Sequence, residues 1–167
     1  MNNLYVSKIL DNLFIGNELS FTYLYNSCIN CHLLINVSQD GIPFNPAPEL
    51  PTSSIPNIDP ECIRIPIPIS TRIHICSNVL KYFSRTNNKI DEFMKSGKSV
   101  LILSSKGLDR APTIVIAFLM SKKQMRLRQA YNFVKSKRPT IKLSNNLYNQ
   151  LVIYDKWLQI KRLFTSH

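Results

Sequence analysis

The chain of 167 residues contains no apolar run long enough to cross a membrane. Its first residues show no basic segment followed by an apolar stretch, the pattern of a secretory signal. We therefore expect no transmembrane segment and a location in the cytoplasm or the nucleus. The sequence also has no internal repeat and no linker-like stretch, and 44% of its residues are hydrophobic. These features predict one globular domain over residues 1–167, with its core at about 5–163.

Acidic residues are scarce, because 10 acids face 21 lysines and arginines and the net charge is +11. The imbalance is confined to the second half of the chain. Before residue 81 there are three basic against six acidic residues, and from residue 81 there are eighteen against four. The basic residues gather in bursts: Lys122, Lys123, Arg126, Arg128, Lys135, Lys137, Arg138 and Lys142. This pattern favours an acidic or phosphorylated protein as partner, with RNA or an anionic lipid as alternatives. A solvated basic surface without a specific ligand is also open.

Cysteines number only four, at positions 28, 31, 62 and 76. The segment Cys28–His32 formally matches the CxxCH pattern of haem attachment. A zinc site would need a second ligand pair, and no pair with suitable spacing follows. The sequence therefore predicts free thiols, no metal and no cofactor.

Apolar segments with two different periodicities alternate along the chain. Strands are expected within residues 6–16 with a turn at Asp11-Asn12, and at 32–37, 61–65 and 99–102. Helices are expected at about 18–29, 76–96, 111–122, 126–137 and 145–163. Residues 40–60 hold six prolines and predict a long irregular loop. The alternation predicts an α/β domain with a mainly parallel sheet and helices on both of its sides.

The last expected helix carries an apolar stripe that we assign to the core. Its members are Leu147, Leu151, Tyr154, Trp157, Leu158 and Leu163. Met and aromatic residues at helical spacing are far more often core than a cofactor site.

The segment Leu103–Pro112 lies between a strand-like run and a long apolar run that suits a helix. A strand, a tight loop with Gly107 and Arg110, and a helix start together form the layout of an anion cradle. Backbone N–H groups and the positive end of the helix dipole converge on such a site, and Arg110 can clamp the anion with two hydrogen bonds. The predicted anion-binding residues are Ser104, Ser105, Lys106, Gly107, Leu108, Asp109 and Arg110.

This loop resembles the HCxxGxxR[ST] signature of cysteine-dependent phosphatases, and most closely that of the dual-specificity group. The resemblance extends over residues 5–160, through Ile9–Asn17, Ile29–Val37, Arg64–Pro66 and Thr113–Met120. It continues in the later positions Ala130, Val134, Lys137, Arg138, Pro139, Ile141, Asn145, Leu147, Gln150, Leu151, Tyr154 and Asp155. Membership would imply a single dual-specificity-phosphatase-like domain. Active members cleave phosphate monoesters through a phosphocysteine, with an aspartic acid as general acid.

The chain departs from that pattern at each position that carries chemistry. Ser104 stands at the cysteine position, Leu103 at the histidine position and Ala111 at the position of the hydroxyl residue. The general-acid region, Ile67-Pro68-Ile69-Ser70-Thr71, contains no acid, so that Pro68 and Ile69 lie where the acid is expected. His74 is the nearest substitute and is otherwise interpreted as an exposed or helix-start histidine.

These departures favour a STYX-like pseudophosphatase, a non-catalytic binding or regulatory module for phosphorylated protein ligands. One alternative is an active protein tyrosine/serine/threonine phosphatase in which Ser104 replaces a native cysteine. Another is a binder of RNA or anionic lipid that acts through its basic surface.

Asp109 leaves two interpretations open. It pairs with Arg110 or a neighbouring base and weakens phosphate binding by repulsion, or it faces solvent or a backbone group and leaves the cradle intact. The sequence makes no prediction of the oligomeric state.

Overall fold

The computed structural model of the chain describes residues 5–20, 30–38, 61–64 and 80–165. The elements in chain order are β1 (Val6–Leu10), β2 (Leu13–Gly16), β3 (Leu33–Asn36), β4 (Glu61–Arg64), α2 (Leu80–Lys95), β5 (Val100–Leu103), α3 (Arg110–Lys122), α4 (Leu127–Lys137) and α5 (Asn145–Thr165). Each of them falls within a segment whose type the sequence predicts, with ends that differ by a few residues.

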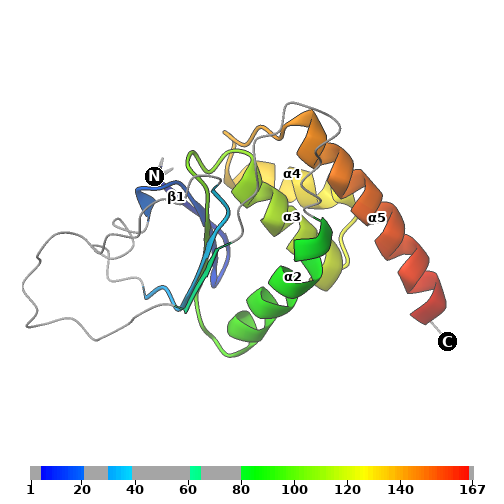
Figure 1. Cartoon of the computed structure of the whole chain (residues 1–167), viewed down its shortest axis with the longest axis horizontal. Helices are drawn as coiled ribbons and strands as arrows, with labels where there is room; N and C mark the ends of the chain where they lie inside the picture. Colours follow the sequence, from blue (N-terminus) through cyan, green and yellow to red (C-terminus); the bar gives the residue numbers. More distant parts are fainter. Residues whose placement is uncertain (1–4, 21–29, 39–60, 65–79, 166–167) are drawn as a thin grey trace, which may run out of the picture.

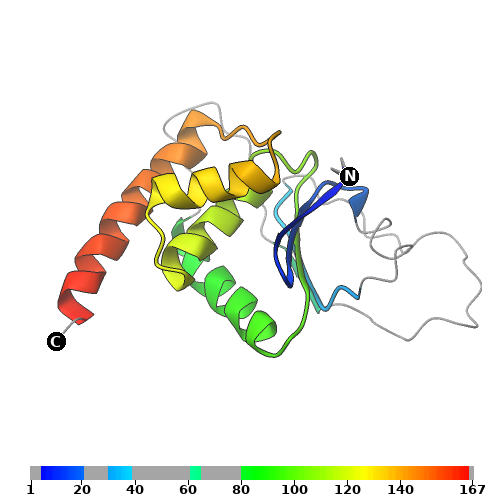
Figure 2. The ribbon, with the colours of Figure 1, turned by 180° about the vertical axis from the view of Figure 1, so that it is seen from behind.

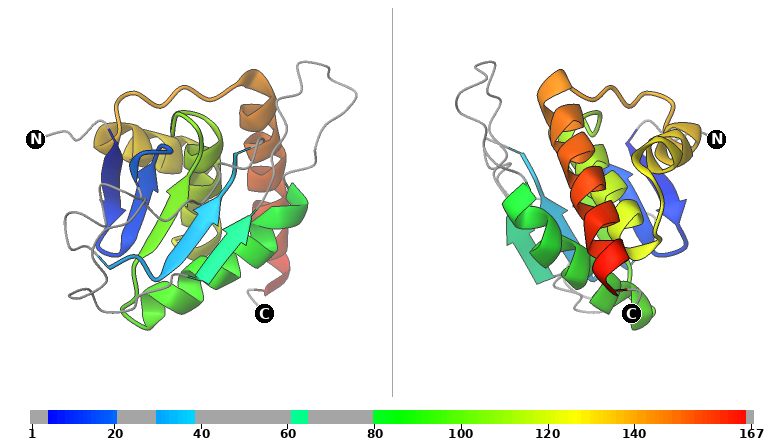
Figure 3. Two further views of the ribbon diagram at one scale, coloured as in Figure 1. Left: turned by 60° about the vertical axis from the view of Figure 1, so that its left-hand side comes forward. Right: turned by 90° about the vertical axis from the view of Figure 1, so that its right-hand side faces the viewer.

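The strands form one mixed sheet in the order β1-β2-β5-β3-β4 (Figure 3). β1 and β2 are an antiparallel hairpin joined at Asp11-Asn12, and the other neighbours pair in parallel. The register aligns Gly16 with Leu103 and Leu103 with Asn36, so that β2, β5 and β3 end side by side. The segments that follow these strands therefore meet at one edge of the sheet, where open α/β sheets bind ligands.

The four described helices, α2 to α5, all cover the same face of the sheet (Figures 1 and 2). The predicted α/β domain with a mainly parallel sheet is confirmed. The helix expected at about 18–29 lies largely outside the described residues. The expected loop at 40–60 lies wholly outside them.

Helix α3 is the centre of the molecule, because all ten residues from Ala111 to Met120 are buried. It packs against α2, α4 and α5 as well as against β2 and β5. A helix enclosed in this way needs apolar residues on every side, which explains its continuous hydrophobic sequence. The strands supply the facing layer through alternate residues such as Ile15, Ile35 and Ile102, each fully buried.

Asp155 joins α5 to the start of α4. Its carboxylate accepts hydrogen bonds from the backbone N–H of Leu127 at 3.2 Å and from Nε2 of Gln159 at 2.8 Å. It also pairs with the guanidinium of Arg126, whose Nη2 lies 3.1 Å from Oδ2. The carboxylate therefore caps a free N–H of the first turn of α4 while it fixes the position of α5.

The predicted core stripe of α5 is partly wrong. Leu147, Leu151, Tyr154 and Leu158 are buried, as expected, but Trp157 is 49% and Leu163 is 72% exposed. The buried positions repeat at intervals of four and three residues, so that the next would fall at residue 161 or 162. Leu163 lies beyond this face, and Trp157 is rotated from Leu158 by about 100° around the helix.

The loop between β5 and α3 lies against the end of β2 through a contact between two glycines. Gly107 has a φ of +65°, which L residues rarely adopt. A Cβ at this position would lie 2.5 Å from the carbonyl oxygen of Gly16. The position therefore requires glycine for its backbone conformation and for lack of space.

We predict that Asp155→Ala lowers the free energy of unfolding by about 2–3 kcal/mol, because the buried N–H of Leu127 loses its acceptor. In this size range the melting temperature should fall by about 5–10 °C. Arg126→Ala is the control and should cost less, about 1 kcal/mol, because the Arg126 side chain is 56% exposed. Thermal and urea denaturation of the three proteins measures both effects, and equal losses would show that Asp155 acts only as a partner of Arg126.

A second pair of variants separates the two requirements at Gly107. Gly97 has a similar φ of +70°, but a Cβ there would meet nothing within 4 Å. Gly97→Ala should lower the free energy of unfolding by about 1 kcal/mol, because only the backbone conformation is unfavourable for alanine. Gly107→Ala should cost about 2–4 kcal/mol, because the new methyl group also collides with Gly16. Urea denaturation measures the difference, and equal costs would contradict a tight contact between the loop and β2.

Candidate functional site: the loop at the start of α3

Residues 104–109 connect the end of β5 to the first residue of α3, Arg110. Three backbone hydrogen bonds hold the start of this loop. The N–H of Ser104 donates to Gly16 O at 3.3 Å, that of Glu18 donates to Ser105 O at 3.4 Å, and that of Gly107 donates to Ser104 O at 3.1 Å. The loop thus belongs to the edge of the sheet where β2 and β5 end.

The loop keeps a set of unused backbone donors. Within the described part of the chain, no hydrogen bond engages the N–H groups of Ser105, Lys106, Leu108, Asp109 and Arg110. Backbone N–H groups ahead of a helix, together with the positive end of the helix dipole, favour an anion at this position. The predicted cradle residues are therefore together in one loop, and the backbone supplies donors whatever the side chains are.

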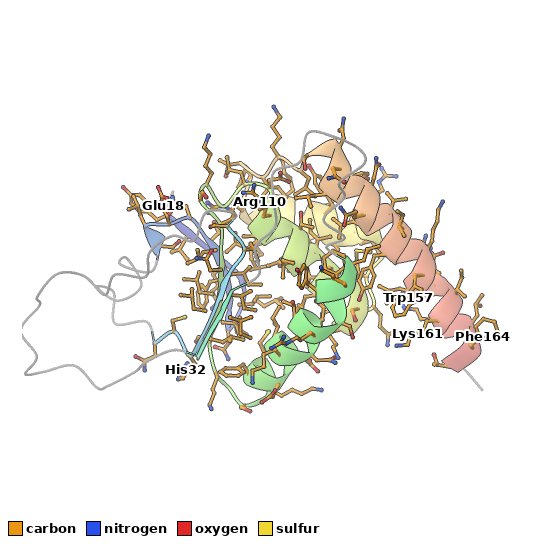
Figure 4. All side chains as sticks on the ribbon, in the orientation of Figure 1. Glu18, His32, Arg110, Trp157, Lys161 and Phe164 are labelled. Atoms are coloured by element: carbon orange, nitrogen blue, oxygen red, sulfur yellow. The ribbon has the colours of Figure 1, made fainter. Side chains whose placement is uncertain are left out.

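Arg110 is the first residue of α3 and is half-buried. Among the described residues, none forms an ion pair or a hydrogen bond with its guanidinium. Figure 4 shows Arg110 at the same end of the molecule as Glu18, which follows β2. The side chain is thus placed at the loop and its donors are available to a ligand.

Asp109 bonds to the backbone and does not neutralise Arg110. Its Oδ1 accepts a hydrogen bond from the N–H of Ser144 at 2.9 Å. Its carbonyl oxygen accepts bonds from the N–H of Thr113 at 3.1 Å and from the Thr113 hydroxyl at 2.8 Å. This geometry corresponds to the second of the two interpretations, in which the carboxylate binds a backbone group. The aspartate ties the loop to the segment that enters α5.

Arg138 holds the loop in place through its buried side chain, a role that the sequence did not indicate. Its Nε donates to Gly107 O at 2.9 Å and its Nη1 donates to Ser7 Oγ at 3.0 Å. The residue is only 4% exposed, and this burial lowers the pKa of its guanidinium. Its assignment to the basic surface was wrong, because the end of α4 directs the side chain inward. The Arg-Pro pair that ends α4 is the only sequence signal that sets it apart from its basic neighbours.

A further contact completes the support of the loop. The N–H of Lys142 donates to Leu108 O at 2.8 Å. The loop is therefore held by the end of β2, by the residue after α4 and by the segment before α5, and no described residue bonds to the N–H groups of its middle.

Ser104 lies at the bottom of the loop and is 4% exposed. His32 is the one histidine among the described residues, and it lies at the opposite end of the sheet (Figure 4). Its Nδ1 accepts a hydrogen bond from the N–H of Ser99, just before β5, whereas Ser104 follows β5. Five residues of extended chain separate these positions by about 16 Å. His32 is therefore out of reach as a base for the Ser104 hydroxyl.

The residues at the family's histidine and hydroxyl positions contribute packing. Leu103 is 4% exposed and belongs to a buried cluster with Val6, Phe14, Leu34 and Leu101. Ala111 is fully buried in the main core. The predicted degenerate general-acid region, with Pro68 and Ile69, and its substitute His74 lie outside the described residues.

In the described part of the chain, no group of three or more His, Cys, Asp or Glu side chains could hold a metal ion. Cys31 is buried there, and its thiol donates a hydrogen bond to Leu33 O at 3.4 Å, while Cys28 and Cys76 lie outside the described residues. No described helix combines the length and the apolar character that a membrane span requires.

Comparison with known proteins assigns this architecture to a family. Residues 13–156 match the family described as "Dual specificity phosphatase, catalytic domain". The chain is 30% identical over 156 residues to human dual specificity protein phosphatase 16, with 92% of this chain and 21% of the human protein covered. It is 28% identical over 152 residues to putative tyrosine phosphatase 123R of invertebrate iridescent virus 6, with 91% of this chain and 93% of the viral protein covered.

A solved structure shows the same fold. The human tyrosine phosphatase-like serine/threonine/tyrosine-interacting protein superposes with a TM-score of 0.73 at 22% identity, over 94% of this chain and 99% of that one. The chain spans about a fifth of the length of the human relative, 21%, so that the match concerns a domain of that protein. The sheet order, the loop between β5 and α3 and these matches agree, and the chain belongs to the dual-specificity phosphatase family.

Proposed function

We propose that the chain is a non-catalytic member of its family, which binds a phosphorylated protein ligand in the loop from Ser104 to Arg110. The observation that carries the proposal is a loop whose backbone donors and Arg110 have no partner among the described residues, with a serine at the nucleophile position. The donors suffice to bind a phosphate group. The serine is a poor replacement for the thiolate on which this family's chemistry depends.

The physical reason lies in the ionisation of the nucleophile. An aliphatic hydroxyl loses its proton far less readily than a thiol and needs an adjacent base. No described histidine is near Ser104, and the exposed Lys106 is the one cation beside it in the loop sequence. The segment Ile67–Thr71, where the family carries its general acid, contains no acidic residue.

The net charge of +11 also favours an acidic ligand. A phosphorylated side chain presents three acceptor oxygens, which match the backbone donors and the planar guanidinium of Arg110. The name of the structural neighbour, a phosphatase-like interacting protein, is consistent with binding in place of turnover.

We predict that phosphotyrosine or phosphothreonine peptides bind the protein and that Arg110→Ala weakens them at least tenfold, because a charge-assisted bidentate contact is lost. Fluorescence anisotropy with phosphorylated and unphosphorylated peptides measures the affinities. Lys123→Ala is the matched control, since it removes one positive charge at the opposite end of α3. Equal losses of affinity for the two variants would indicate that the ligand binds to the general basic surface and not to the loop.

We predict that the unmodified protein does not turn over phosphate esters and that Ser104→Cys restores at most slight activity. An aryl phosphate with an acidic leaving group needs little help from a general acid, so that any restored turnover should be confined to it. Phosphoserine peptides, whose leaving group must be protonated, should remain intact. Phosphate release by Ser104→Cys, with Ser104→Ala as the control without a nucleophile, measures both. Robust turnover of both substrates would contradict the proposal.

A further inference from the structure

Six large apolar side chains of α5 are exposed, and four of them lie in one line along the outer side of the helix. Ile153, Trp157, Ile160 and Phe164 are 54%, 49%, 55% and 80% exposed. Figure 4 shows Trp157 and Phe164 on the half of α5 that leads to the C-terminus, and Figure 3 shows α5 as an outermost helix. We call these four residues the outer seam.

The spacing of the outer seam is that of a coiled coil. Its members follow one another at intervals of four, three and four residues, which are the d-a-d-a positions of a heptad repeat. At about 100° per residue, they lie within about 60° of the helix circumference. Leu163, which is 72% exposed, lies beside the outer seam at a g position and widens the exposed apolar face to about 120°. The heptad spacing of the outer seam fits one partner helix.

Trp157 is already ordered for such a contact. Its ring stacks on that of Tyr154, with centroids 5.7 Å apart and an interplanar angle of 13°. Lys161 Nζ lies 5.1 Å from the centroid of the Trp157 ring. A partner would meet a large aromatic surface whose conformation is fixed, which reduces the entropy lost on binding.

The charges beside the outer seam determine which kind of partner helix it favours. Lys156 and Lys161 occupy the flanking g and e positions, and both are exposed. The one acidic residue of α5 is Asp155, which is buried and paired with Arg126. The edge of the outer seam is thus positive without compensation from its own helix.

A second copy of the chain is a poor occupant. In a parallel pair of helices, the g position of one faces an e position of the other, so that Lys156 would meet Lys161. In an antiparallel pair, g faces g and e faces e, and lysine again meets lysine. Like charges in these positions oppose association.

We propose that the outer seam of α5 is a docking site for an amphipathic helix of another protein, with apolar residues in its a and d positions and glutamates in its e and g positions. This inference is independent of the proposed function of the loop. It identifies a surface on the opposite side of α5 from the core, and it requires no phosphate group.

The test uses two synthetic helical peptides of three heptads, both with leucine at a and d. One carries glutamate at e and g, which also keeps the peptide from pairing with itself, and the other carries lysine there. Trp157 is the single tryptophan of the chain, so that its emission reports binding at the seam directly. We expect the glutamate peptide to bind in the micromolar range with a blue shift of this emission, and the lysine peptide to bind at least about tenfold more weakly.

Two variants make the test specific. The double variant Lys156→Glu/Lys161→Glu should invert the preference between the peptides. Ile160→Ser should weaken binding of the glutamate peptide about tenfold. Leu19→Ser, at a similarly exposed apolar position outside α5, should leave this binding unchanged. Circular dichroism and thermal melting verify that the variants are folded, as expected for exposed positions.

Several results would overturn the proposal. These are equal binding of both peptides, an unchanged preference in the double lysine variant, or insensitivity to Ile160→Ser. A blue shift with phosphatidylserine vesicles but not with the glutamate peptide would assign the surface to lipid. Dimerisation in sedimentation that Ile160→Ser abolishes would assign it to a second copy.

Discussion

The burial of α3 on all sides is the constraint on which the rest of the structure depends. The helix is enclosed by the sheet and by α2, α4 and α5, and ten consecutive residues lose their contact with water. A helix in this position cannot tilt or slide without opening the core on several sides. Its first residue, Arg110, is consequently fixed relative to the strand ends. The geometry of the loop follows from the packing of the core and not from the chemistry of the site.

The loop is also held by groups that lie outside it. Arg138, Lys142 and Ser144 contact it from the segment between α4 and α5, and Gly16 contacts it from β2. None of these contacts involves a side-chain atom of Ser104, Leu103 or Ala111. The contacts that shape the loop therefore do not depend on the residue at the nucleophile position, and the loop conformation is compatible with a serine in place of the family's cysteine.

Sequence periodicity predicted most of the described fold, because strands and helices here follow strong apolar patterns. The loop was also predictable, since Gly107 and Arg110 are bracketed by a strand and a helix. The role of Arg138 was not predictable, because it stands in a run of basic residues and the sequence does not show that its side chain points into the core. Trp157 was misplaced for a related reason. From sequence alone, an apolar residue at the border of a helical stripe is assigned to the core. Only the packing of α5 shows which side of the helix other elements cover.

The bond between Asp109 and Ser144 has a geometric consequence. Ser144 directly precedes α5, so the helix begins beside the loop and extends from it as a rod of 21 residues, about 30 Å long. The outer seam begins near the middle of this rod and extends to its far end. A single ligand that carries a phosphorylated residue and an acidic helix would need a connecting segment of matching length to reach both. With that length, binding at one end would raise the local concentration at the other, and two weak contacts would act as one strong one. The protein would then select its ligands by distance as well as by charge.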